Sequence, residues 1–404
     1  MSNHPVQKKK VAIIGTVGVP ANYGGFETLT EHLIEDLGQK YDLTVYCSGK
    51  KYAVAERKNT YKGASLKYLP LDANGIQSIP YDTLSILHAL FFADVLLILG
   101  VAGAWILPFV KWFTNKKIII SIDGIEWKRD KWNLLAKWYL FWAEGLAVKY
   151  SHIDISDNEA IQDYTAARYG SLSRIIEYGA DHTIKVPITR TDVKQYPFLK
   201  ELYAFKVCRI EPENNVHVIL EAFAATDRMP LVIIGNWDKS AYGKSLKAKY
   251  REHPSIHLLD PIYNQTKLDS IRGNASLYVH GHSAGGTNPS LVEAMYLGLP
   301  ILANGVSYNR VTTEEQALYF HDLNSLVDQL NELYSAKLNS VGAAMAEIAC
   351  RRYRWSHIAF KYELLIEEAL QLTDKLSVEA KTKKLSYSEL LRLGQAHLKI
   401  NLNY

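Results

Sequence analysis

The chain alternates short runs of apolar residues with stretches in which apolar residues recur at helical spacing. Continuous apolar strands that alternate with helices are typical of a parallel sheet covered by helices on both faces, so the pattern predicts an α/β fold. In the first half, strands are predicted at Val11–Thr16, Leu43–Cys47, Leu66–Leu69, Val95–Leu99, Ile118–Ile122, Ile153–Ile155 and Ile175–Glu177. Helices are predicted between them, including Phe26–Leu37, Asn133–Tyr150 and Asn158–Tyr169.

A polar segment at Ala180–Gln195 interrupts this alternation and is the best candidate for a linker. A second series of strands is predicted after it, at Ala204–Cys208, Leu231–Ile234, Ile256–Leu259, Leu277–Val279 and Pro300–Ala303. We therefore expect two Rossmann-like domains with doubly wound parallel sheets, facing each other across a cleft. The expected division is 1–184, 185–350 and a C-terminal helical segment, 351–404, that partly returns to the N-terminal domain. The helical pattern at Tyr387–Leu398 is expected to be peripheral.

Composition and charge exclude several classes of protein. The 404 residues are 48% hydrophobic and 22% charged, which excludes a disordered or fibrous chain. A formal net charge of +4 is too small to support nucleic-acid binding by bulk electrostatics. Three widely separated cysteines (Cys47, Cys208, Cys350) fit a reducing cytoplasm better than a disulfide framework. The apolar uncharged run Val95–Val110 is shorter than the ~20 residues of a spanning helix and is broken by glycine and proline, so no spanning segment is expected.

A glycine-rich loop follows the first predicted strand, with four glycines among residues 15–25. Its spacing does not fit the G-x-G-x-x-G dinucleotide fingerprint. Gly24 and Gly25 stand at the start of the predicted helix, where free backbone N–H groups and the helix dipole favour an anion. They are therefore candidates for binding a phosphate group, and a simple turn before the helix is the alternative.

A stronger pattern lies after the predicted strand Leu277–Val279. A Gly-Gly-Thr-Asn loop at 285–288 precedes a predicted helix that begins at Pro289. Such a loop can present N–H groups and a threonine hydroxyl to a diphosphate. Glu293, one turn into an otherwise apolar helix, is a candidate for accepting hydrogen bonds from ribose hydroxyls. A solvent-exposed glutamate is the alternative, but the apolar surroundings favour function.

At these residues the sequence resembles a known family. The segment Glu293–Leu302 is similar to the nucleotide-sugar site of retaining glycosyltransferases of family four, which have the GT-B fold. The segments 15–28, 123–132 and 285–290 resemble a bacterial subgroup that contains rhamnosyltransferases of cell-wall and capsular polysaccharide assembly. The resemblance extends over most of the chain, about residues 10–370.

The resemblance implies binding sites for a donor and an acceptor. The implied donor-binding residues are Gly24, Gly25, Arg209, Asn214, Gly285, Gly286, Thr287, Asn288 and Glu293. The implied acceptor-binding residues are Phe26, Glu27, Asp123, Glu126, Lys128 and Arg129. Arg209, Glu293 and Asp123 are the candidate catalytic residues. Asp123 stands roughly where many relatives keep an active-site histidine, and a carboxylate there can orient or deprotonate the acceptor hydroxyl. A turn or helix-capping role for Asp123 beside Gly124 is the alternative.

Two positions depart from the family pattern. The first glutamate of the family's E-x7-E pair corresponds to Gly285, and the lysine that usually accompanies the arginine corresponds to Asn214. Loss of a glutamate that commonly contacts the donor hexose fits a 6-deoxy sugar such as rhamnose. Without the lysine, Arg209 and the loop N–H groups must neutralise a larger share of the negative charge on the diphosphate. A surface ion pair is the alternative role for Arg209.

The histidine pair His280 and His282 lacks a third ligand at metal-binding spacing, and no D-x-D sequence occurs in the chain. We therefore expect activity without a metal or other cofactor. The resemblance implies retaining transfer of L-rhamnose from dTDP-L-rhamnose to a lipid-linked saccharide, by a cytoplasmic protein at the inner face of the membrane. The alternatives are the same fold with a UDP- or GDP-hexose donor, a nucleotide-sugar epimerase, and a non-catalytic carbohydrate-binding protein.

Six of the eight tryptophans lie between Trp105 and Trp142. The window from Trp105 to Tyr150 also holds eight basic and four acidic residues, a net charge of +4 that equals the charge of the whole chain. Trp132, Leu135, Trp138 and Trp142 follow helical spacing and can pack in a core. Aromatic residues among lysines equally suit the surface of an anionic membrane, and both interpretations are open at this point.

Overall fold

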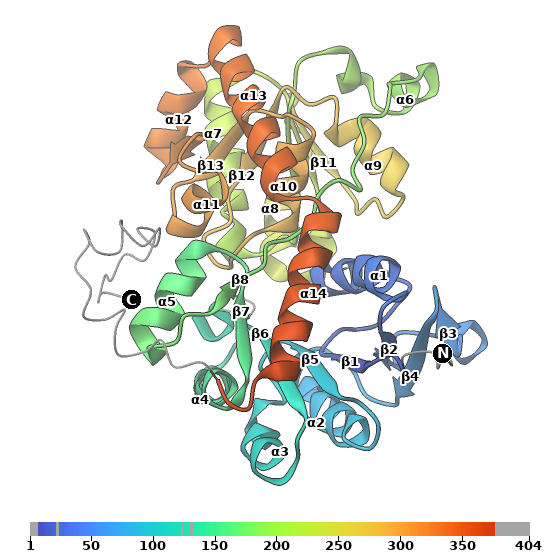
Figure 1. The fold of residues 1–404 in the computed structure, drawn as a ribbon. Helices are drawn as coiled ribbons and strands as arrows, with labels where there is room; N and C mark the ends of the chain where they lie inside the picture. Colours follow the sequence, from blue (N-terminus) through green and yellow to red (C-terminus); the bar gives the residue numbers. More distant parts are fainter. Residues whose placement is uncertain (1–6, 22–23, 123, 129–131, 376–404) are drawn as a thin grey trace. The chain divides into compact units, whose positions relative to one another are not determined.

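The computed structural model describes residues 7–21, 24–122, 124–128 and 132–375, and these form two compact units (Figure 1). Unit 1 contains the described residues up to Ile176 and those from Ser356 onward, and unit 2 is Glu177–Trp355. The boundaries lie eight and five residues from the predicted 184/185 and 350/351. Residues after Ile176 join unit 2 through contacts such as the Ala180 N–H, which donates to the Tyr353 carbonyl at 2.7 Å.

In unit 1 the described residues form an eight-stranded sheet in the order β3-β4-β2-β1-β5-β6-β7-β8. The strands are β1 Lys10–Ile14, β2 Asp42–Ser48, β3 Thr60–Tyr61, β4 Ala64–Leu69, β5 Val95–Leu99, β6 Lys117–Ile122, β7 Ile153–Ser156 and β8 Arg174–Ile175. All pairs are parallel except β3–β4. This hairpin turns at Lys62 and Gly63, both with positive φ (46° and 91°), and its two-residue strand β3 is too short to show a sequence period.

Helices cover the sheet of unit 1, as predicted for strands that are apolar along their whole length. Ala12, Ile14 and Leu96 point toward α2, α3 and α4, whereas Val11 and Ile13 are buried on the opposite face. The helices are α1 Gly25–Leu37, α2 Ser78–Ala89, α3 Leu107–Phe113, α4 Leu134–Tyr150, α5 Glu159–Tyr169 and α14 Trp355–Gln371, with 3-10 turns η1 Val54–Glu56, η2 Gly75–Gln77, η3 Ala104–Ile106 and η4 Glu126–Lys128.

The C-terminal helix α14 is attached to unit 1 by hydrogen bonds and ion pairs. Its Glu363 pairs with Lys40 at 2.6 Å and its Glu368 with Arg174 at 2.6 Å. Tyr41 donates its hydroxyl to Glu367 at 2.5 Å. The predicted helix at Tyr387–Leu398 lies outside the described residues.

Unit 2 holds a six-stranded parallel sheet, described in the order β11-β10-β9-β12-β13-β14. The strands are β9 Ala204–Val207, β10 Leu231–Ile234, β11 Ile256–Leu259, β12 Leu277–His280, β13 Ile301–Asn304 and β14 Leu318–Phe320. The helices are α6 Arg190–Gln195, α7 Val216–Thr226, α8 Ala241–Tyr250, α9 Gln265–Arg272, α10 Pro289–Tyr296, α11 Ser307–Thr312, α12 Leu323–Asn331 and α13 Ser335–Arg352, with 3-10 turns η5 Pro197–Lys200, η6 Pro212–Asn214 and η7 Trp237–Lys239. The expected linker thus contains helix α6, which Thr189 caps from its side chain.

Two cores lie on the two faces of the unit 2 sheet. Helices α10 and α13 close one core, with Met295 and Met345 inside, and α7 and α12 close the other, with Ile219 and Leu326 inside. The strand order changes direction between β9 and β12, as it does between β1 and β5 in unit 1. In doubly wound sheets ligands bind outside the carboxyl ends of the strands at such a point. The loops after β9, β12 and β1 are therefore the places to search for a site.

Candidate functional site

Glu293 lies on α10 and is held at both carboxylate oxygens. Its Oε1 is 3.1 Å from His182 Nε2, and its Oε2 accepts from Arg272 Nη1. On the other side of the imidazole, the Trp355 indole N–H donates to His182 Nδ1 at 3.0 Å. An indole nitrogen only donates, so Nδ1 carries no proton and Nε2 donates to Glu293. The chain Trp355–His182–Glu293 thus fixes both the tautomer of the histidine and the orientation of the carboxylate.

Arg272 brings a second acid into this network. Its side chain is fully buried, and Nη2 pairs with Asp269 Oδ1 at 2.7 Å while Nη1 bonds Glu293. Asp269 is also fully buried and accepts from Gln265 Nε2 at 3.1 Å. Two carboxylates therefore share one guanidinium in a site from which most water is excluded.

The electrostatics favour the ionised form of Glu293. Burial by itself raises the pKa of the carboxyl, but Arg272 and the hydrogen bond from His182 outweigh it and hold the pKa below its usual value. Burial also acts against the charge of Arg272, and the two carboxylates reverse that effect and raise its pKa. Glu293 is consequently an anion with the capacity to accept further hydrogen bonds, since a carboxylate offers about four acceptor positions.

The loop after β9 and the loop after β12 are fastened to each other. Ser283 donates its N–H and its hydroxyl to the Glu213 carbonyl, at 2.8 and 2.9 Å, and Asn215 Nδ2 donates to the Gly281 carbonyl at 2.9 Å. A Cβ at Gly281 would lie 2.3 Å from the Asn214 carbonyl oxygen, so only glycine permits this approach. The two predicted halves of the donor site therefore form one surface at the switch point of the sheet.

Arg209 and Asn214 differ in their surroundings. The Arg209 side chain is 40% exposed, with Nε 3.7 Å from Glu211 Oε2, so its guanidinium is accessible to a ligand. Asn214 is buried, and its Nδ2 donates to the Arg209 carbonyl at 2.6 Å. Asn214 thereby fixes the backbone that carries Arg209, while direct binding of a donor by Asn214 stays a prediction.

Helix α10 begins at the residue that the sequence predicts, and a side chain just before it caps the helix. Pro289 is the first helical residue, and the Asn288 side chain accepts from the Ser290 N–H at 3.1 Å. Gly285 has a φ of 129° and open space around its Cα, whereas Thr287 is buried. Gly285 and Gly286 are half-buried and carry no side chain, so a ligand could approach the backbone of the loop closely there.

Buried bases lie beneath this loop. Lys206 on β9 is fully buried, and burial lowers the pKa of its amine, which has no hydrogen-bond partner in the described part of the chain. His280 at the end of β12 is equally buried, and burial together with nearby Lys206 holds its pKa well below the usual value. Its ring stacks on His282 with centroids 4.3 Å apart. The histidine pair is thus part of the packing beneath the loop.

In unit 1, Glu27 organises the loop after β1. It is buried in the first turn of α1, and its Oε1 accepts from the Val17 N–H at 2.7 Å and faces the Thr16 hydroxyl at 3.3 Å. A Cβ at Gly24 (φ 145°) would lie 1.7 Å from Glu27 Oε2. The positive φ favours glycine at position 24, and any side chain there would also displace the Glu27 carboxylate. Gly25 begins α1 and Phe26 is half-buried beside it, and the ligand-binding roles of these four residues stay predictions.

The segment after β6 is only partly described. Asp123 and Arg129, two of the predicted acceptor residues, lie outside the described residues. Glu126 accepts from the Trp132 indole at 3.1 Å, and Lys128 is exposed. Trp127, between them, donates to the Tyr164 hydroxyl at 3.1 Å.

Beneath Trp127, the hydroxyls of Tyr164 and Tyr169 both donate to the buried carboxylate of Glu144 at 2.5 Å. Burial raises the pKa of Glu144 despite these hydrogen bonds. A buried polar network therefore anchors the segment that carries Glu126 and Lys128.

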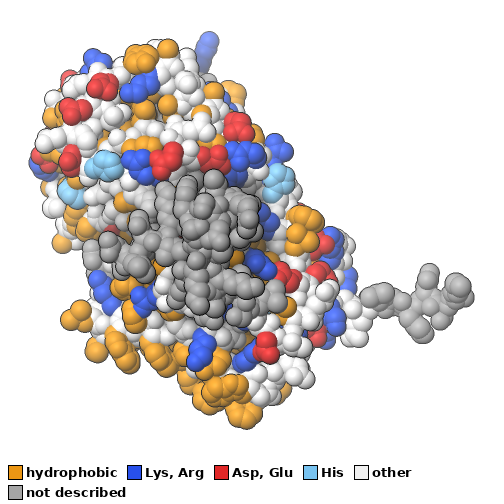
Figure 2. All heavy atoms as spheres, turned by 60° about the vertical axis from the view of Figure 1, so that its left-hand side comes forward, with side chains coloured by type: hydrophobic (Ala, Val, Ile, Leu, Met, Phe, Trp, Pro, Cys, Tyr) orange, Lys and Arg blue, Asp and Glu red, His pale blue; other side chains and the backbone are white. Residues whose placement is uncertain are grey.

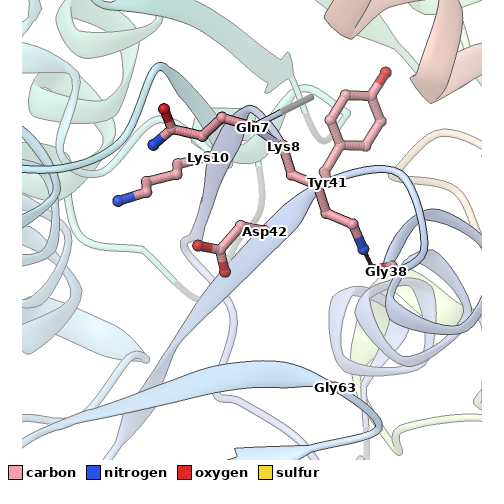
Figure 3. Close-up of a pocket in the computed structure, with 7 residues that line it drawn as sticks. All are labelled: Gln7, Lys8, Lys10, Gly38, Tyr41, Asp42 and Gly63. Carbon is pink, nitrogen blue, oxygen red and sulfur yellow. Dashed lines mark hydrogen bonds between the residues drawn. The ribbon is translucent and has the colours of Figure 1, made fainter. Parts of the chain in front are cut away.

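Two further features lie apart from this chemistry. A pocket of about 290 Å³ is lined by Lys8, Lys10, Tyr41, Asp42 and Gly63, among others, at the amino-terminal ends of β1 and β2 (Figure 3). This is the edge opposite the one where parallel sheets bind ligands.

Within the described ranges, no group of three or more His, Cys, Asp or Glu side chains is arranged to hold a metal, and no helix is long and apolar enough to cross a membrane.

Comparisons with known proteins agree with this architecture. Residues 189–340 match the family Glycosyl transferases group 1, and residues 8–181 match the family Domain of unknown function (DUF1972). A search of curated proteins finds no match to the sequence.

Solved structures with the same fold are numerous. Sucrose-phosphate synthase (tll1590) from Thermosynechococcus elongatus has a TM-score of 0.75 at 15% identity, covering 89% of this chain and 99% of that one. HepE from Anabaena, in complex with UDP, has a TM-score of 0.68 at 13% identity, covering 90% and 100%. The catalytic domain of starch synthase IV from Arabidopsis thaliana, bound to ADP and acarbose, has a TM-score of 0.66 at 12% identity, covering 91% and 100%.

These similarities show that the chain has the two-domain GT-B fold of glycosyltransferases, as the sequence predicted. Residues 189–340, which match the group 1 glycosyltransferase family, include Arg209, the loop at 281–288, Arg272 and Glu293. The rhamnosyltransferase subgroup stays a prediction.

Proposed function

We propose that this protein is a retaining glycosyltransferase that transfers L-rhamnose from dTDP-L-rhamnose to a lipid-linked saccharide. The observation that carries the proposal is the pre-oriented Glu293 carboxylate beside the paired loops after β9 and β12, within a region that matches group 1 glycosyltransferases. Fold neighbours solved with UDP or UDP-glucose support a nucleotide sugar as the donor.

The reaction develops negative charge on the departing diphosphate and positive charge on the sugar. Arg209, with its exposed guanidinium, and the backbone N–H groups of 285–288 would stabilise the leaving group, an effect worth several kcal/mol in comparable sites. The Glu293 carboxylate would accept from the nucleoside hydroxyls and set the position of the diphosphate. A departing phosphate oxygen can take the acceptor proton on the same face, with Asp123 positioning the acceptor.

The deoxysugar specificity is supported by what is missing at position 285. A glycine there removes a carboxylate that could accept from hexose hydroxyls, and its surroundings are open. Deoxyribose lacks a 2′-hydroxyl, so Glu293 would accept one ribose hydrogen bond from dTDP where UDP offers two. A UDP-hexose donor is the second candidate, favoured by the HepE complexes with UDP and UDP-glucose.

A donor panel separates the candidates. The purified protein is incubated with dTDP-L-rhamnose, UDP-glucose, UDP-galactose and GDP-mannose and a synthetic lipid-pyrophosphate sugar, and products are identified by mass spectrometry. Transfer from dTDP-L-rhamnose with an unchanged anomeric configuration is expected. Transfer from a hexose donor alone would overturn the rhamnose assignment, and conversion of the donor without an acceptor would indicate an epimerase.

Two substitutions test the proposed roles. Arg209→Ala removes a 40% exposed side chain and should lower kcat by roughly 100-fold without affecting stability. Glu293→Gln, which keeps the shape of the side chain beside Arg272, should mainly raise the KM for the donor. Near-wild-type kinetics in both variants would contradict the roles proposed for Arg209 and Glu293.

We further propose that the reaction needs no metal ion. Dialysis against EDTA should leave the rate unchanged, because Arg209 and the loop N–H groups supply the positive potential. Loss of activity in EDTA with recovery on addition of manganese would overturn this.

A further inference from the structure

Large apolar side chains are exposed along two neighbouring helical segments of unit 1. The most exposed are Leu134 (85%), Leu135 (80%) and Phe113 (79%), with Trp138 at 65%. Isolated exposed apolar residues are ordinary, but a contiguous group marks an interaction site. We define the α3–α4 apolar face as Trp105, Phe109, Trp112, Phe113, Leu134, Leu135, Trp138, Phe141 and Trp142.

Helix α4 presents its bulky side to solvent. Its exposed residues 134, 135, 138, 141 and 142 recur at the spacing of one helical face, whereas the buried face holds Leu140, Ala143 and Ala147. A helix that stabilises only its own unit buries its largest apolar side chains. The interpretation of Leu135, Trp138 and Trp142 as core residues is therefore wrong.

The two helical segments form one continuous surface. The Tyr139 hydroxyl of α4 donates to the Ala102 carbonyl just before η3 at 2.6 Å. The Trp112 ring of α3 lies edge-on to Tyr150 of α4, with centroids 5.7 Å apart. Figure 2 shows hydrophobic side chains gathered along the lower part of that view, with lysine and arginine side chains beside them.

The charges around this face are mainly basic. Lys137 is half-buried and Lys149 exposed on α4 itself, and Arg168 lies over the Phe141 ring at 3.7 Å. The described acidic residues between 105 and 150 are Glu126, which bonds Trp132, and Glu144, which is buried. Neither presents a free carboxylate at the surface of the apolar face.

We propose that the α3–α4 apolar face docks the protein on a bilayer that contains anionic lipid. Tryptophan, phenylalanine and leucine would enter the interfacial region, and the lysines would remain at the level of the headgroups. A symmetric dimer through the same face is disfavoured, because it would gather the basic residues beside the face of both copies in one interface.

The position of this face adds a functional consequence, which rests on the proposed function. Phe141 packs edge-on against Trp127, with ring centroids 5.3 Å apart, and Trp127 lies in the segment predicted to bind the acceptor. A bilayer bound at the face would therefore lie beside the segment that receives a lipid-linked saccharide.

Vesicle flotation tests the docking without any substrate. The full chain is floated with vesicles of phosphatidylcholine alone and of phosphatidylcholine mixed with phosphatidylglycerol. Binding is expected to the mixed vesicles and to weaken with added salt. In the double variant Leu135→Ser/Trp138→Ser, binding should fall roughly tenfold or more, because two apolar side chains no longer enter the interface. Lys137→Glu/Lys149→Glu should reduce binding to anionic vesicles specifically.

The matched control is Leu202→Ser/Tyr334→Ser, which changes side chains of similar exposure (73% and 61%) in unit 2 and should bind as wild type does. All variants should keep the wild-type melting temperature. Absence of binding to both vesicle types, or unchanged binding by Leu135→Ser/Trp138→Ser, would overturn the proposal. A dimer in analytical ultracentrifugation that this variant abolishes would identify a second copy as the occupant and overturn it as well. With a soluble short-chain acceptor the same variant should retain full activity, so failure of docking and failure of the transferase assignment give different results.

Discussion

The imidazole Nε2 of His182 lies 3.1 Å from the carboxylate Oε1 of Glu293, and the Trp355 indole holds the other ring nitrogen at 3.0 Å. Because the indole N–H points at Nδ1, the geometry selects the tautomer that donates from Nε2 to Glu293. Glu293 consequently meets a ligand already oriented, without reorganisation of its side chain.

His182→Ala should therefore weaken donor binding more than it slows turnover. Loss of one hydrogen bond to a charged carboxylate corresponds to about 1.5–3 kcal/mol, or roughly 10-fold to 100-fold in kcat/KM for the donor. His182→Gln keeps an N–H donor in reach of Glu293 and should restore most of the loss. Steady-state kinetics over a range of donor concentrations separate the change in KM from the change in kcat. Equal defects in the Ala and Gln variants would show that the histidine serves packing alone.

Arg272 should be essential for stability near neutral pH. Arg272→Met leaves Asp269 and Glu293 without the guanidinium that they share, and removal of one partner of a buried ion pair costs about 3–5 kcal/mol. Urea unfolding of the wild type and the variant gives the difference in the free energy of unfolding. The double variant Asp269→Asn/Arg272→Met should recover part of that loss.

The ion pair between Arg272 and Glu293 should also make the free energy of unfolding depend on pH. The folded-state pKa of Glu293 is lowered, so its contribution to stability is complete above the ordinary glutamate pKa and is lost as the pH falls through the folded value. In Arg272→Met this loss of stability at acid pH should be absent. The difference in the free energy of unfolding between wild type and variant should therefore shrink toward pH 3. A difference independent of pH would contradict the ion-pair explanation.

Lys206→Met should stabilise the protein. The buried amine forms no hydrogen bond with the described residues, and methionine fills a similar volume, so a gain of about 1–3 kcal/mol in the free energy of unfolding is expected at pH 7. The folded-state pKa of Lys206 is lowered, so between that value and 10.5 the unfolded chain binds the extra proton. Stability of the wild type therefore rises with pH over that range.

In Lys206→Met this rise should be smaller, which denaturant unfolding at pH 7 and pH 9.5 can measure. Lys206→Ala, which leaves a cavity, is the control that separates removal of the charge from loss of volume. A Met variant less stable than wild type would show that the amine has a favourable role beneath the loop.

Several parts of the site follow from local sequence. Pro289 and Asn288 mark the start of α10 by residue type, and Glu293 stands out because it interrupts an apolar helix. His182 and Arg272 carry no such signal. His182 lies in a polar segment without periodicity, and Arg272 in the last turn of α9 has the appearance of a basic residue that complements the helix dipole. Their contacts with Glu293 span 111 and 21 residues of sequence, a separation that periodicity does not describe.

By itself the sequence determined the alternation of strands and helices and the two parallel sheets, because burial on both faces of a strand leaves a continuous apolar run and burial on one face of a helix leaves a period. The GT-B fold was implied by the resemblance of segments such as Glu293–Leu302 to a known family. The sequence left open which face of α4 is buried, since the helix is apolar on both of its sides. Only the tertiary structure decided that small residues of α4 face the sheet while Leu135 and Trp138 face solvent. Only the tertiary structure likewise placed one buried guanidinium between Asp269 and Glu293, because long-range packing selects such contacts from chain segments whose local patterns are ordinary.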